Sequence, residues 1–236
     1  STRTYWKHKG HLLCSTCKDN IEAIVRGATP MYYCGTVPDS SVNGVSMTVT
    51  LPGGGNELTV ARMSLKELMP LQSTAFSLCE EFAATLRRRG FLNGNFELDI
   101  AVASDAAMHG TVDQPLIEGV DTAHRGFLIN ERQKNAWVYD REKSPTEVLA
   151  DTAQACQIRE PAYGMIYSLT FQATSSRVTY SAMPKPSRGS SDRPPAVAGR
   201  FYPAAPAEMN AMLDDMLAGE ATPEPCKAIM VPHAGW

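Results

Sequence analysis

The sequence lacks long apolar runs and a secretory leader pattern, and each absence removes a class of protein. None of its apolar runs approaches the roughly 20 residues that a membrane-spanning helix needs. The first residues, STRTYWKHKG, have no apolar centre of the kind that a secretory signal requires. We therefore expect a cytoplasmic protein that has no membrane partner.

Charge and cysteine content exclude two further classes. The net charge of −3 over 236 residues gives no electrostatic reason to bind nucleic acid. The one dense basic cluster, at residues 87–89, ends a helical pattern, where cations are favoured by the negative end of the helix. Six cysteines in a chain of this length are too few for a small disulfide scaffold, so we expect reduced thiols.

Helical and strand patterns alternate through the first half of the chain. Residues 11–26 have an apolar face at helical spacing and predict a helix. Residues 45–60 alternate apolar and polar side chains on both sides of three glycines, which predicts a β-hairpin. A second helix is predicted over residues 73–89, followed by a strand over residues 96–103.

The next segment continues the mixture without a regular βαβ repeat. Residues 124–140 predict two short strands around a polar turn, and residues 164–174 predict another strand. Between them, Ser144, Pro145 and Glu147 form the start signal of a helix, with a capping residue, a first-turn proline and a capping-box acid. We therefore expect an α+β fold with a mainly antiparallel sheet.

The composition changes after the last of these strands. Residues 181–199 are rich in Pro, Ser and Gly and have almost no large apolar side chains, which predicts a linker. Beyond it, a helix is predicted over residues 206–218 and a strand over residues 227–231. These two elements cannot form a core alone, so we expect a first domain over residues 1–180 and only the beginning of a second over residues 193–236. The apolar face of the predicted helix consists of Met209, Met212, Leu213, Met216 and Leu217.

Two specific motifs mark this second region. RPPAVAGRFYP, the helical pattern after it, and the ending VPHAGW resemble the opening of the Memo family, from Arg193 to Trp236. The resemblance implies an α/β domain similar to class III extradiol dioxygenases, in which histidines hold iron, copper or zinc. His233 is the one family metal ligand present, so the resemblance implies an N-terminal piece of a longer protein. The rest of that domain is its implied partner, and no metal is expected in this piece alone.

A second resemblance covers the first domain. The segments CKDNIEAIVRG and HRGFLINERQKNAWVYD, with SPTEVLADTAQAC after them, are similar to the AMMECR1 family, which is encoded beside or fused to Memo domains and radical-SAM enzymes. The Arg-Gly-Cys-Ile-Gly loop of that family is replaced here by NELTVARMSLKEL. The resemblance implies an accessory or substrate-handling module for an unknown small molecule, attached to a dioxygenase-like, metal-dependent oxidoreductase. A radical-SAM protein is a further implied partner.

The N-terminus offers an alternative metal site. His8, His11, Cys14 and Cys17 recur at a spacing of three and are suitable zinc ligands in kind. Positions three apart on a continuous helix drift around its axis, so this site requires a loop before Cys14. Buried thiols beside exposed histidines are the alternative interpretation.

A group of histidines and aspartates gives the first domain a possible chemistry of its own. His109 and His124 are expected in or beside loops, with Asp105, Asp113 and Asp121 near them in sequence. Together they would form an acid/base group, which would make the α+β domain itself an enzyme. The alternatives are that they are solvated loop residues, or that the protein is a non-catalytic binding or scaffold protein.

Overall fold

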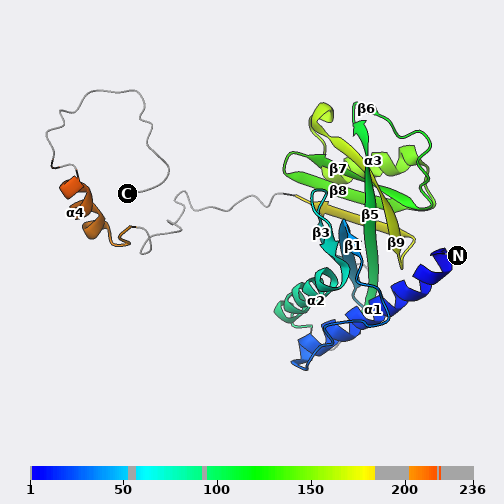
Figure 1. Ribbon diagram of the computed structural model, residues 1–236, viewed down its shortest axis with the longest axis horizontal. Helices are drawn as coiled ribbons and strands as arrows, with labels where there is room; N and C mark the ends of the chain where they lie inside the picture. Colours follow the sequence, from blue (N-terminus) through cyan, green and yellow to red (C-terminus); the bar gives the residue numbers. More distant parts are fainter. Residues whose placement is uncertain (1, 53–56, 92–94, 184–201, 217, 219–236) are drawn as a thin grey trace. The chain divides into compact units, whose positions relative to one another are not determined.

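The chain divides into two compact units, Ser1–Lys185 and Pro186–Trp236, and each is described by itself (Figure 1). The computed structural model describes residues 2–52, 57–91, 95–183, 202–216 and 218. Within these residues, no helix is long and apolar enough to cross a membrane.

The first unit combines helices with an antiparallel sheet, which confirms the predicted α+β fold. Its helices are α1 (Thr2–Arg26), α2 (Leu71–Arg88) and α3 (Pro145–Cys156), with a short 3-10 turn η1 (Pro161–Tyr163). Its strands are β1 (Ser41–Val42), β2 (Gly44–Thr50), β3 (Glu57–Met63), β4 (Met69–Pro70), β5 (Glu97–Thr111), β6 (Gln114–Pro115), β7 (Arg125–Glu131), β8 (Lys134–Asp140), β9 (Met165–Ala173) and β10 (Arg177–Ala182).

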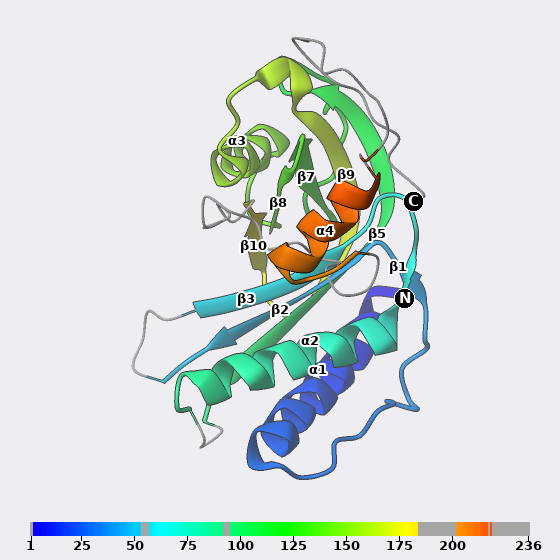
Figure 2. The same ribbon diagram turned by 90° about the vertical axis from the view of Figure 1, so that its left-hand side faces the viewer.

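The main sheet is strongly curved. Its strand order is β10-β8-β7-β9-β5-β2-β3, with β6 paired to β5, while β1 and β4 form a separate small pair. Three strands separate β2 from β8 in this order, yet a Cβ added at Gly44 of β2 would lie 2.6 Å from the ring of Trp137 in β8. The sheet therefore curls until its inner face closes on itself, and its edge strands β3 and β10 come together (Figure 2).

Strand β2 shows how the sequence produces the two faces of this sheet. Successive side chains of a strand point to opposite faces, so its odd-numbered and even-numbered residues separate. The helix-covered face carries fully buried side chains that pack with α1 and α2, namely Val45, Met47 and Val49. The opposite face carries hydroxyl side chains, namely Ser46, Thr48 and Thr50.

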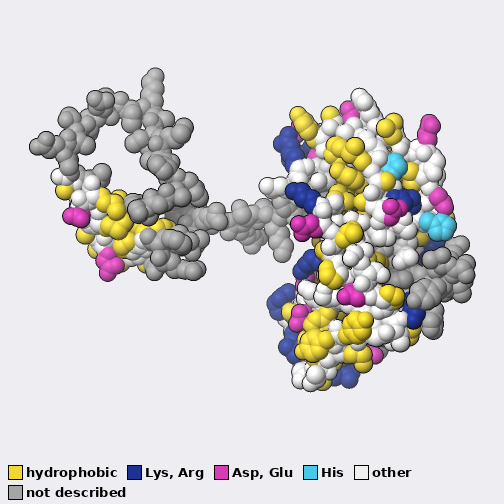
Figure 3. Space-filling view, viewed as in Figure 1, with side chains coloured by type: hydrophobic (Ala, Val, Ile, Leu, Met, Phe, Trp, Pro, Cys, Tyr) yellow, Lys and Arg dark blue, Asp and Glu magenta, His cyan; other side chains and the backbone are white. Residues whose placement is uncertain are grey.

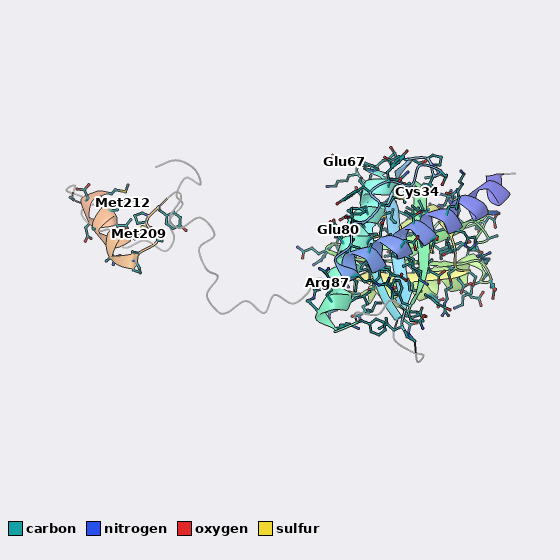
Figure 4. All side chains as sticks on the ribbon, turned by 90° about the horizontal axis from the view of Figure 1, so that it is seen from below. Cys34, Glu67, Glu80, Arg87, Met209 and Met212 are labelled. Atoms are coloured by element: carbon teal, nitrogen blue, oxygen red, sulfur yellow. The ribbon has the colours of Figure 1, made fainter. Side chains whose placement is uncertain are left out.

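Helices α1 and α2 pack together against this sheet, and both predictions of a helix there are confirmed. Arg87, near the end of α2, donates from Nε to the carbonyl oxygen of Val25 at 3.2 Å and also donates to the carbonyl of Ile24 (Figure 4). These carbonyls belong to the last turn of α1, beyond the regular bonds of the helix, and that of Ile24 also accepts the backbone N–H of Gly27 at 3.1 Å. Arg87, a residue of α2, therefore caps the C-terminal end of α1. The buried stripe of α1 consists of Leu13, Cys17, Ile21 and Val25.

Helix α3 begins where the sequence predicts. Ser144 is its N-cap and accepts the backbone N–H of Glu147 at 3.4 Å, while the backbone N–H of Ser144 donates to the Glu147 carboxylate at 2.8 Å. This reciprocal pair is the predicted capping box. Val148 and Cys156 of α3 are fully buried against β7 and β8, so the helix covers that end of the sheet.

Some boundaries differ from the prediction. Strand β10 was not predicted, and it includes Ser181 and Ala182, which were expected to begin the linker. The pattern of β10 is weak because it is an edge strand in which Val178 is the one buried residue. In the second unit, helix α4 (Pro206–Met216) confirms the predicted helix, whereas the predicted strand over residues 227–231 lies outside the described residues.

Glu131 is a buried carboxylate that fixes the segment after α3. Its side chain accepts the backbone N–H groups of Arg159 at 2.9 Å and Glu160 at 2.8 Å, and it pairs with Lys134. The hydrogen bond from Lys134 and the backbone bond from Glu160 lower the pKa of Glu131 to about 2, from an ordinary value of 4.5. Because the folded pKa is depressed, this stabilisation is present above pH 4.5 and is lost as the pH falls toward 2.

Replacing Glu131 with Gln should lower the free energy of unfolding at pH 7 by about 1.5–3 kcal/mol, because the charged acceptor of these bonds is lost. The difference from the wild type should shrink as the pH falls from 4.5 toward 2. Urea unfolding at several pH values measures both effects. Glu118→Gln, at an exposed site, serves as the matched control, and an undiminished loss at low pH would contradict this role for Glu131.

Candidate functional site

The predicted acid/base residues lie around the far half of β5 and the segment that leads to β7. His109 is within β5 rather than in a loop, because this strand continues to Thr111. Asp105 also lies in β5, at a left-handed φ of 55°, where the pairing of β5 with β9 is interrupted. The interruption is a β-bulge, a feature that reorients side chains at the edges of functional sites.

Arg125 of β7 holds this bulge in place. Its Nη1 donates to the Asp105 carboxylate at 2.7 Å and to Thr170 Oγ1 at 3.0 Å, and its Nη2 donates to the backbone oxygens of Asp105 at 2.6 Å and Ser168 at 3.1 Å. Its Nε donates to Ser168 Oγ at 2.9 Å. A guanidinium has five N–H groups, so all of them are engaged. The hydrogen bond and the charge of Arg125 lower the pKa of Asp105 below its ordinary value.

His109 joins the same network through Ser168. Its Nδ1 lies 2.8 Å from the carbonyl oxygen of Leu116, so this nitrogen carries the hydrogen and donates. Its Nε2 lies 2.7 Å from Ser168 Oγ, and in the neutral imidazole it accepts the serine hydroxyl. Ser168 is 0% exposed, so no substrate reaches its oxygen in this structure. The bonds that join His109 to Asp105 connect β5, β7 and β9 and hold the bulge.

The remaining predicted acid/base residues make local pairs. His124 Nδ1 lies 2.7 Å from a carboxylate oxygen of Asp121, and both side chains are more than half exposed. Thr111 Oγ1 donates to the Asp113 carboxylate at 2.5 Å. The described hydrogen bonds thus unite His109 with Asp105 and place His124 with Asp121.

The alternative zinc set requires a loop that the structure does not contain, because α1 runs without a break from Thr2. On this helix His11 is exposed, Cys17 is buried, and Cys14 donates from Sγ to the carbonyl of Leu98 at 2.9 Å. Burial raises the pKa of Cys14 to about 11, and the protonated thiol is not a metal ligand. Among the residues with described side chains, no three His, Cys, Asp or Glu groups are placed to hold a metal ion. The side chain of His8 and all of His233 lie outside that set.

A polar cavity lies where the two edges of the sheet approach. Its volume of about 510 Å³ is in the range of small-molecule sites. The hydroxyl face of β2, β3 and β5 forms one side, and β10, α3 and the segment before α3 form the other. The lining residues that carry polar side chains are Ser46, Thr48, Thr50, Glu57, Thr59, Asp99, Lys143, Asp151, Gln154, Ser175, Arg177 and Thr179.

The strand side of the cavity is a row of aligned polar groups. Thr48 stands opposite Thr59 on one neighbouring strand and opposite Asp99 on the other, and the two threonine hydroxyls are 2.9 Å apart. One oxygen of Asp99 accepts the hydroxyl of Thr174 at 2.8 Å. Ser46 also lines the cavity, although the residue as a whole is only 2% exposed. This side therefore presents fixed hydroxyl and carboxylate groups.

The opposite side contributes charges of both signs. Lys143 and Asp151 form an ion pair at 2.5 Å. Arg177 begins β10 and is exposed, and Gln154 is exposed on α3. Over the face of the first unit seen in Figure 3, acidic and basic side chains are likewise interspersed. The cavity thus combines both charges with neutral donors and acceptors.

Comparison with known proteins shows a similarity of fold alone. No family model matches the chain, and no curated protein matches it. Its fold is similar to the crystal structure of an uncharacterized protein from Pyrococcus horikoshii, with a TM-score of 0.51 and 14% sequence identity. The similarity covers 72% of this chain and 90% of that protein.

The Arg125 network predicts an effect on stability. Replacing Arg125 with Lys should lower the free energy of unfolding by about 1.5–3 kcal/mol, because one ammonium cannot reach acceptors spread around a planar fork. Urea unfolding measures the change. The exposed Arg159→Lys serves as the control. If both variants change stability equally, Arg125 does not hold the bulge.

Proposed function

We propose that the first unit is a substrate-handling module of AMMECR1 type and that residues 193–236 begin a Memo-like, metal-dependent redox domain. The module binds a small polar molecule, which is the substrate of the attached Memo-like domain. The observation that carries this proposal is the cavity of about 510 Å³ lined by polar side chains from both sides of the curled sheet. In this proposal His109 and Asp105 have a structural role, because their hydrogen bonds hold the bulge between β5 and β9.

The chemistry of the second region is supported by its sequence motifs. RPPAVAGRFYP and VPHAGW are the two segments that resemble the Memo family. An imidazole at the end of a strand suits iron, copper or zinc, and His233 is the candidate ligand. One imidazole is too few for a catalytic metal, which generally needs three protein ligands. The proposed metal site therefore needs histidines in addition to His233.

The proposed module should retain a small molecule from a protein-free cell extract. Native mass spectrometry of the chain after incubation should show a discrete added mass. Gln154→Trp should abolish it by filling the cavity, and Thr146→Trp, an exposed position of the same helix that does not line the cavity, should leave it intact. An absent mass, or one that both variants retain, would refute the substrate-handling role.

The metal proposal is tested in the protein extended through a complete Memo-like domain. After dialysis that protein should retain a transition metal, whereas residues 1–236 should bind it weakly because most of the ligands are missing. Elemental analysis measures both, and His233→Ala in the longer protein should remove most of the metal. Unchanged metal content in that variant would leave a binding or scaffold role in place of the redox role.

A further inference from the structure

The charges around the cavity define the class of molecule that it fits. Asp99 is half-buried and stands opposite Thr48, whose hydroxyl lies 2.9 Å from that of Thr59. Thr174 engages one oxygen of Asp99. A carboxylate held in this way is a strong acceptor for an ammonium group, since charge-assisted hydrogen bonds are about twice as strong as neutral ones. Glu57 of β3, which stands opposite Thr50, adds a second negative charge to the lining. The strand side of the cavity therefore favours a cationic end of a ligand.

Arg177 supplies the opposite charge. Its backbone N–H donates to Ser175 Oγ at 3.3 Å, and within the described residues its guanidinium has no partner. The other cation of the lining, Lys143, is already paired with Asp151. A free guanidinium binds a carboxylate through two parallel hydrogen bonds. Arg177 is therefore the group that favours an anionic end.

These two charges belong to one small region of the fold. Asp99 is bonded to Thr174, and Arg177 follows Thr174 by three residues across the turn between β9 and β10. Both side chains line the same cavity. A molecule with an ammonium and a carboxylate satisfies both, whereas a dication or a dianion satisfies one and meets repulsion at the other.

Ser46 supports a polar ligand independently of these charges. It lies on the cavity face of β2 and lines the cavity, although the residue as a whole is only 2% exposed. The one buried side-chain polar atom without a partner among the described residues is Trp137 Nε1, so the Ser46 hydroxyl is not such an atom and can bond a ligand in the cavity. A polar group between the two charged ends, or at one of them, would suit this hydroxyl.

We propose that the cavity binds a small zwitterion whose ammonium group pairs with Asp99 and whose carboxylate pairs with Arg177. This proposal rests on the substrate-handling function and names its ligand class. The test uses isothermal titration calorimetry with unbranched ω-amino acids of graded chain length, because the series samples different separations of the two charges. Diamines, dicarboxylates and diols of the same lengths are the comparison probes. At least one ω-amino acid should bind more tightly than every comparison probe of its length.

Two substitutions separate the two ends of the ligand. Asp99→Asn keeps an acceptor for Thr174 and should weaken ω-amino acids and diamines about 10- to 100-fold, with no effect on dicarboxylates. Arg177→Gln should weaken ω-amino acids and dicarboxylates to a similar extent and spare diamines. Asp113→Asn and Arg159→Gln, which lie outside the cavity lining, should change nothing.

Two outcomes would contradict the proposed zwitterion. Diols that bind as tightly as ω-amino acids and resist both substitutions would overturn the zwitterion and leave the cavity as a neutral-ligand site. No saturable binding of any ω-amino acid would also overturn it. The extract experiment decides the substrate-handling role separately, because an added mass that Gln154→Trp removes supports that role whatever the ligand class.

Discussion

The two-residue alternation of β2 is the constraint on which both the core and the cavity depend. Val45, Met47 and Val49 close the core beneath α1 and α2, and the alternate residues Ser46, Thr48 and Thr50 form the hydroxyl side of the cavity. A shift of one residue in the pairing of β2 would exchange these two faces. It would bury three hydroxyl side chains under the helices and place three large apolar ones in the cavity. Stability thus enforces the register that also builds the binding surface.

Elements with strong local signals could be predicted from the sequence. The capping box at Ser144 and the alternation on both sides of the glycines at 53–55 each specify structure within a few residues, and both elements are found. The second half of β5 could not be predicted, because the bulge at Asp105 breaks the alternation and its backbone depends on a guanidinium twenty residues away. β10 could not be predicted either, since an edge strand buries only part of one face.

The candidate site was harder to predict because it is assembled from distant segments. His109 and Asp105 stood out by residue type, whereas Arg125 and Ser168, which connect them, carry no local signal. The cavity collects side chains from residue 46 to residue 179, and its threonines read as the solvent side of an ordinary hairpin. The curl of the sheet turns that side inward. The cross-strand pair of Thr48 and Thr59 was the sequence signal that could have indicated a polar surface there.

The cap that Arg87 provides ties together two helix ends about sixty residues apart in the sequence. The last turn of α1 cannot fray while Arg87 holds its carbonyls, and α2 must be folded for Arg87 to be in place. Local opening of the end of α2 therefore frees the carbonyls of the last turn of α1, and the amide hydrogens of the two helix ends should exchange with solvent as one cooperative unit. Folding of the N-terminal helix is in this respect a long-range event, which has to wait for α2 to be synthesised and packed.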